Sequence, residues 1–99
     1  MGQAKTTAYD TADHLHTPEQ VAAYLEVCFE EAGNDAEFIA RALGAAARAK
    51  GMTQIARDAG VSRESLYKAL SGERNPSFNT ILKVLDALGI RLRPEVVSR

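Results

Sequence analysis

Two short helical patterns meet at a single glycine between Gln54 and Leu70, in the stretch QIARDAGVSRESLYKAL. Apolar residues occur in it only at positions that face inward on two short helices, and Gly60 permits the sharp turn that would join them. This spacing predicts a helix-turn-helix over residues 53–70, which places its second helix in the major groove of DNA. The pattern indicates a DNA-binding protein rather than an enzyme.

A longer helix is predicted upstream, from Thr17 to Ala32. Thr17 is the expected N-cap, Pro18 takes the first helical position, and the Gln20 side chain can bond back to the cap. Gly33 supplies the left-handed residue that ends such a helix. The apolar stripe of this helix is Val21, Leu25, Cys28, Phe29 and Ala32.

Four further helices are predicted, each preceded by a residue that can cap it. The caps are Asp35, Thr53, Ser62 and Ser77, and the helices end near Gly51, Ala59, Leu70 and Gly89. For these four helices in chain order, the inward-facing residues are Phe38, Ile39, Ala42, Leu43, Ala46 and Ala49 in the first; Ile55, Ala56 and Ala59 in the second; Leu66, Ala69 and Leu70 in the third; and Phe78, Ile81, Leu82, Leu85 and Leu88 in the fourth. We expect an all-α, five-helix domain over residues 17–93, with a flexible arm (1–16) and a short tail (94–99).

The segment after the last predicted helix alternates apolar and basic residues over positions 90–93, which is typical of a strand, until Pro94 ends it. Either this segment pairs with its copy in a second subunit, or it lies as extended chain on the fifth helix. A homodimer is expected, because one groove-binding helix contacts few base pairs and two half-sites lie about 34 Å apart. The fifth helix and residues 90–93 are the candidates for its interface.

Charge is divided unevenly along the chain, although the net charge is only −1. Residues 1–50 carry a net −4, from eight acidic and four basic residues, whereas residues 51–99 carry a net +3, from eight basic and five acidic residues. The predicted helix-turn-helix lies in the basic half, where contacts with phosphate require it. The acidic half is suited to attract a basic protein.

Several other functions lack support in the sequence. The single Cys28 excludes an intrachain disulfide and fits a small buried apolar residue in a cytoplasmic protein. His14 and His16 have no further ligands at zinc-site spacing, and no apolar run approaches the roughly 18 residues of a membrane helix. No nucleophile-and-base motif or phosphate-binding glycine loop occurs, so we expect no enzymatic activity, cofactor or metal.

The exposed edge of the second motif helix is the candidate for reading bases. Its members are Arg63, Glu64, Tyr67 and Lys68, of which Arg63 can bind guanine through two hydrogen bonds. Two alternatives stay open: Glu64 and Lys68 can instead pair with each other, and Tyr67 can pack against the following loop. The candidates for phosphate contacts are Gln54, Ser62, Ser71, Arg74, Asn75, Ser77, Asn79 and Thr80.

The stretch GMTQIARDAGVSRESLYKALSGERNPSFNTILKVLDALGIRL resembles the lambda-repressor-like, Xre-type DNA-binding domains. The matching positions are Ala56 as the small residue, Gly60 as the turn glycine, Val61 as an apolar residue, Leu66 as a core aliphatic, and the segments Pro76-Ser77 and Ala87-Leu88-Gly89. One departure is that Thr53-Gln54 runs straight into Ile55-Ala56, whereas most such domains have two more residues between these pairs.

This shortened spacing, with the preceding YLEVCFEEAGNDAEFIARALGAAARAKGM, resembles the probable addiction-module antidote proteins, a branch near the HigA-like antitoxins. The resemblance covers residues 20–93. It implies an antitoxin that binds and silences a small RelE/ParE-type toxin encoded beside it and represses their shared operon. Toxins of that type are basic, which suits the acidic first half of the chain.

Two other functions remain compatible with the same residues. A stand-alone or phage-type transcriptional repressor would make the same groove contacts without a toxin. An interaction adaptor would keep the fold without binding DNA, as the near-neutral total charge suggests. A co-purifying basic protein favours the antitoxin, and a toxin-free dimer with toxin-independent repression favours the repressor.

Overall fold

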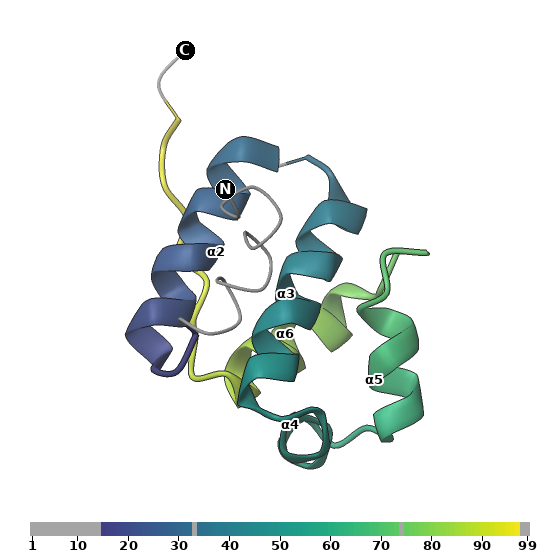
Figure 1. The fold of residues 1–99 in the computed structure, drawn as a ribbon. Coiled ribbons are helices and arrows are strands. Elements are labelled where there is room, and N and C mark those ends of the chain that lie inside the picture. The colour runs from purple at the N-terminus through teal and green to yellow at the C-terminus, as the bar shows by residue number, and fades with distance from the viewer. Residues whose placement is uncertain (1–14, 33, 74, 98–99) are drawn as a thin grey trace, which may run out of the picture.

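The computed structural model describes residues 15–32, 34–73 and 75–97. The regular structure of these residues is entirely helical, with five helices and no strand (Figure 1). The helices are α2 (Pro18–Ala32), α3 (Ala36–Lys50), α4 (Met52–Ala59), α5 (Arg63–Ala69) and α6 (Phe78–Ala87). The predicted all-α class is confirmed for this part of the chain.

Four of these helices begin at side-chain caps that the sequence predicts. The Gln20 N–H donates to Thr17 Oγ1 at 3.1 Å, and the Thr17 N–H donates to Gln20 Oε1 at 3.1 Å, so the two residues form the expected reciprocal pair. Asp35, Ser62 and Ser77 each accept a hydrogen bond from the N–H three residues later. Local sequence therefore fixes where α2, α3, α5 and α6 start.

The start of α4 differs from the prediction, and Thr53 is not its cap. The helix begins at Met52, so Thr53 lies in the first turn and is exposed. Gly51 alone separates α3 from α4, with φ 115° and ψ 110°, and no side chain caps α4. The earlier start buries the Met52 side chain, which is 6% exposed, and apolar burial of this kind outweighs a missing cap.

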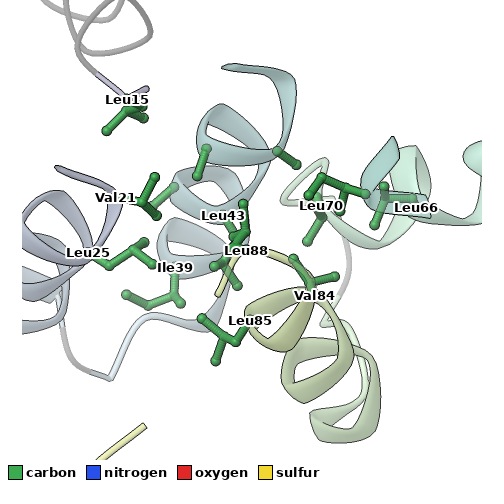
Figure 2. Packing of buried hydrophobic residues seen from close by; sticks show 14 of the residues in the cluster. Leu15, Val21, Leu25, Ile39, Leu43, Leu66, Leu70, Val84, Leu85 and Leu88 are labelled. Carbon is green, nitrogen blue, oxygen red and sulfur yellow. The ribbon is translucent and has the colours of Figure 1, made fainter. Parts of the chain in front are cut away.

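The core lies where α2 packs on α3 and α4 packs on α6, with α3 contacting both α4 and α6. Figure 2 shows Leu43 of α3 and Leu88 beyond α6 at its centre, with Leu66 and Leu70 reaching in from α5 and its end. A Cβ atom at Gly44 would lie 2.9 Å from the Leu70 carbonyl oxygen. Only glycine lets the backbone of α3 come so close to the end of α5.

The predicted burial on α6 is wrong at two positions. Phe78 is 66% exposed and Leu82 is 43% exposed, whereas Val84, which was not assigned to the core, is completely buried. The helix is apolar around more of its circumference than α3 and α4 cover, so Val84, Leu85 and the following Leu88 face inward, while Phe78 and Leu82 face out. Ile81 is partly buried and packs against the core. Phe78 and Leu82, one turn apart, form an exposed apolar pair.

The two ends of the described chain differ in how they pack. Leu15 is only 3% exposed and belongs to the core cluster, so the folded part includes a residue that the sequence assigned to the arm. Residues 1–14 of the predicted arm and the predicted helix-ending Gly33 lie outside the described residues. At the other end the Ile90 N–H donates to the Leu85 carbonyl oxygen at 2.8 Å, after which residues 91–97 are exposed and non-helical.

Candidate nucleic-acid interface

The turn between α4 and α5 has the geometry that the sequence predicts. Gly60 is left-handed, with φ 76° and ψ 31°, and its N–H donates to the Arg57 carbonyl oxygen at 3.2 Å. The Val61 N–H donates to the Ala56 carbonyl oxygen at 3.0 Å and closes the turn. Figure 1 shows α4 nearly along its axis and α5 lengthwise, so the two helices cross steeply. This is the local arrangement that a helix-turn-helix requires.

One face of α5 is anchored in the core, which determines the face that it presents outward. Leu66 is completely buried and Leu70, the C-cap residue, is 3% exposed. All four candidate base-reading residues lie on the outward side and are exposed: Arg63, Glu64, Tyr67 and Lys68. Their spacing brings them together as one continuous polar edge.

The four edge residues form two pairs, each one helical turn apart. Arg63 Nη2 donates to the Tyr67 hydroxyl oxygen at 3.5 Å, and the guanidinium carbon lies 5.5 Å from the centre of the Tyr67 ring. Lys68 Nζ lies 3.7 Å from Glu64 Oε2, so the unbound protein has the Glu64–Lys68 pair that the sequence left open. Because both partners are exposed, this ion pair stabilises by only about 0–1 kcal/mol and can open at little cost.

Gln54 lies at the third position of α4, with its side chain held by neighbours on the same helix. Its Nε2 donates to Asp58 Oδ1 at 2.9 Å, and Arg57 Nη1 donates to Gln54 Oε1 at 3.4 Å. Arg57 was not among the predicted site residues. Its spacing of three residues from Gln54 is the signal that could have identified it, since such neighbours share a helix face.

Five further phosphate candidates lie around the two ends of α5 and at the start of α6: Ser62, Ser71, Ser77, Asn79 and Thr80. Ser71 Oγ donates to the Lys68 carbonyl oxygen at 3.0 Å and accepts from the Glu73 N–H at 3.2 Å. Ser77 Oγ donates to Thr80 Oγ1 at 2.9 Å. Asn79 is exposed, Thr80 is half-buried, and Arg74 lies outside the described residues. The Ser62, Ser71 and Ser77 hydroxyls therefore already support local structure in the unbound protein.

Asn75 lies in a different environment from the other candidates. It lines an open pocket together with Glu31, Asp35 and Glu37 from the region where α2 gives way to α3. The carboxylates around this pocket repel anions, so this environment opposes the phosphate contact predicted for Asn75.

An acidic surface lies on α2, at the opposite side of the molecule from α5 in Figure 1. Its exposed carboxylates are Glu19, Glu26, Glu30 and Glu31. The acidic helix and the candidate DNA-reading helix therefore lie on opposite sides of the molecule in Figure 1, so the uneven charge of the sequence is also uneven in space.

Cys28 is 5% exposed and packs within α2 beside Tyr24. Burial raises the pKa of the Cys28 thiol, whereas a reactive thiol needs a lowered pKa. Burial, together with the nearby thiol, raises the pKa of Tyr24 to about 12.

Among residues 15–32, 34–73 and 75–97, no group of three or more His, Cys, Asp or Glu is arranged to hold a metal. No helix in this part of the chain is long and apolar enough to cross a membrane.

The described residues define a small all-helical protein in which the short helices α4 and α5 meet at a left-handed glycine and α5 carries an exposed polar edge. Residues 5–96 match the model of a family described as "Probable addiction module antidote protein", and the chain belongs to this family. An uncharacterized protein of Haemophilus influenzae is 49% identical over 85 residues, which is 86% of each chain. No solved structure matches this chain. The resemblance to the probable addiction-module antidote proteins is therefore confirmed.

Proposed function

We propose that this protein is the antitoxin of a type II toxin–antitoxin module. It neutralises a RelE/ParE-type toxin by direct binding, and it represses its own operon by sequence-specific DNA binding as a homodimer of lambda-repressor-like, Xre-type helix-turn-helix domains. The observation that carries the proposal is the match of residues 5–96, nearly the whole chain, to the probable addiction module antidote proteins.

The outward edge of α5 supports the DNA-binding part of the proposal. In this proposal Arg63 binds guanine, Glu64 accepts from a cytosine amino group, and Lys68 contacts a base or a phosphate. Tyr67 can contact a thymine methyl group or a sugar. The phosphate contacts proposed around this edge come from Gln54, Ser62, Ser71, Arg74, Asn75, Ser77, Asn79 and Thr80, of which Asn75 has the least favourable surroundings.

The acidic surface of α2 supports the toxin-binding part. A basic toxin and a helix with four exposed glutamates attract each other, and such complementarity raises the rate of association and selects the partner. Because α2 and α5 lie on opposite sides of the molecule in Figure 1, the proposal has the toxin and the operator bound at the same time.

The exposed apolar pair on α6 supports the homodimer. Phe78 and Leu82 are 66% and 43% exposed, and they lie on α6, the next helix after α5. A dimer that covers them removes apolar surface from water and joins two copies of α5.

The proposal is tested with the full-length protein, its own promoter, and the protein encoded beside it in the genome. We expect the promoter to be bound with an affinity that falls as salt rises, and the neighbouring protein to be toxic and neutralised by this chain. Arg63→Ala should weaken promoter binding and keep neutralisation. Lys83→Ala, which removes a similar charge from an exposed position on α6, serves as the matched control and should keep both.

Each failure has a distinct meaning. A toxin-free dimer that represses its promoter by itself would overturn the antitoxin and indicate a stand-alone repressor. Neutralisation without salt-dependent promoter binding would overturn the DNA-reading part alone.

A further inference from the structure

The chain beyond α6 exposes a strand-like sequence that forms no strand within the described residues. Residues 91–97 are all exposed, and they make no backbone hydrogen bond to another described residue. Leu92, Val96 and Val97 are 40%, 93% and 70% exposed. Figure 1 shows this segment running out as a single extended trace toward the C-terminus. Its backbone donors and acceptors and its apolar side chains are available to a partner.

The two faces of this segment differ in character when it is extended. Ile90, Leu92, Pro94 and Val96 alternate with their neighbours and share one apolar face. Arg91, Arg93, Glu95 and Val97 share the other face, which is mostly charged. Such a segment suits pairing with an extended strand that can match both faces.

We propose that residues 91–97 pair with the same residues of a second copy, as antiparallel strands related by a two-fold axis at Pro94. This inference rests on the homodimer in the proposed function and specifies its contacts. In this register Arg93 lies directly opposite Glu95 of the second copy, and Leu92 lies opposite Val96. The two-fold axis repeats both pairs, so each dimer has two opposite-charge pairs and two aliphatic pairs.

The position of the proline restricts the register. Opposite residues in an antiparallel pair alternate between those that exchange hydrogen bonds and those that do not. Pro94 has no N–H, so it must occupy a position that exchanges none, and its neighbours Arg93 and Glu95 then supply donors toward the partner. A two-fold axis at Pro94 satisfies this condition in both copies.

Registers centred on the neighbouring residues bring like charges together. A centre at Leu92 places Arg91 opposite Arg93, a centre at Arg93 places that residue opposite itself, and a centre at Glu95 does the same with the glutamate. Like charges directly opposite each other destabilise a strand pair. Among these four centres, Pro94 is the one without a like-charge pair or a missing donor.

Charge reversal in the full-length protein, without DNA or toxin, tests the register by sedimentation equilibrium. Arg93→Glu and Glu95→Arg should each raise the dimer dissociation constant about tenfold, since each creates two like-charge pairs. An equimolar mixture of the two variants should recover wild-type affinity, because both pairs in the mixed dimer are then attractive. Arg91→Glu is the matched control and should change the dissociation constant less, since Arg91 lies opposite Val97.

A disulfide gives a second readout, in a Cys28→Ala background. Pro94→Cys should oxidise to a covalent dimer, because opposite Cα atoms at such a position lie about 4.5 Å apart. Val96→Cys should cross-link much more slowly, since its opposite residue is Leu92. Cross-linking of both variants at equal rates would overturn the register.

The outcomes separate this inference from the proposed function. A wild-type dimer that is insensitive to reversal at Arg93 and Glu95 would overturn the register and leave the homodimer standing. A wild-type monomer at concentrations that saturate the promoter would overturn both. A dimer that follows the predicted pattern but ignores the promoter and the neighbouring protein would support the register and overturn the proposed function.

Discussion

The Tyr67 hydroxyl accepts a hydrogen bond from Arg63 Nη2 at 3.5 Å, while its ring lies 5.5 Å from the guanidinium carbon. The phenol therefore contacts the guanidinium through both its ring and its oxygen, one helical turn away. Since Arg side chains lose rotational freedom when they bind, a contact that restricts Arg63 beforehand lowers that cost.

Arg63→Ala is expected to weaken operator binding by about 1–3 kcal/mol and to relax base choice at one position. The reason is that a guanidinium that binds one base pair distinguishes it from the others. Titrations against the operator and against a set of single-base variants measure this loss. An equal loss on random DNA would show that Arg63 contacts only phosphate.

Gly60→Val is expected to destabilise the protein by about 1–2 kcal/mol or more, because an L residue is strained at a φ of 76° and a β-branched one more so. No atom lies within 4 Å of the added Cβ, so the loss comes from the backbone rather than from a clash. Urea unfolding measures it, and Gly60→Asn should lose less. Unchanged stability in the valine variant would contradict the left-handed turn.

Gly44→Ala is expected to destabilise the protein by about 1–3 kcal/mol for a different reason. The added Cβ would lie 2.9 Å from the Leu70 carbonyl oxygen and push α3 away from the end of α5. Alanine is otherwise preferred to glycine within a helix by about 1 kcal/mol, so a more stable variant in urea unfolding would show that this contact is looser.

Tyr24 is expected to make stability depend on pH in alkaline solution. Its pKa is raised from 10.0 to about 12, so between these pH values the unfolded chain loses the phenolic proton and the folded chain keeps it. The free energy of unfolding therefore falls as pH rises through this window. Tyr24→Phe should lose less stability than wild type from pH 10 to 12 in urea unfolding. The exposed Tyr67→Phe is the control, and parallel curves for Tyr24→Phe and wild type would contradict the prediction.

Leu82→Ser is expected to weaken dimerisation while changing stability by no more than about 0.5 kcal/mol, since Leu82 is 43% exposed. Leu85→Ser on the same helix should instead unfold the protein, because Leu85 is 1% exposed. Analytical ultracentrifugation and thermal melting measure the two effects. A Leu82→Ser variant that dimerises like wild type would remove α6 from the interface.

Helix positions could be predicted well because their determinants are local. Each of the four side-chain caps accepts a hydrogen bond from the backbone N–H three residues later in the chain. These caps are Thr17, Asp35, Ser62 and Ser77. The start of α4 was missed because Gly51 serves as both the end of one helix and the start of the next, and a glycine leaves no capping signal in the sequence.

Which residues are exposed depends on how the helices pack, and the periodicity of apolar residues in the sequence does not specify that packing. α6 has more apolar residues than one buried face needs, so only the positions of α3 and α4 decide that Val84 faces inward and Phe78 outward. The exposed edge of α5 was easier to predict than that of α6, because Leu66 and Leu70 leave α5 a single possible inward face. The acidic surroundings of Asn75 could not be predicted, since Glu31 and Asp35 are distant from it in sequence.

Gly51 is the whole connection between α3 and α4, which leaves two rotatable backbone bonds to set the direction of everything that follows. A connection this short allows little change in the angle between the two helices. One inserted residue at this non-helical connection would add two more rotatable backbone bonds, so the direction of α4 relative to α3 would no longer be fixed by a single residue. The orientation of α4, and of α5 after it, therefore depends on a connection one residue long. Insertions and deletions are expected in longer loops of the chain and not at Gly51.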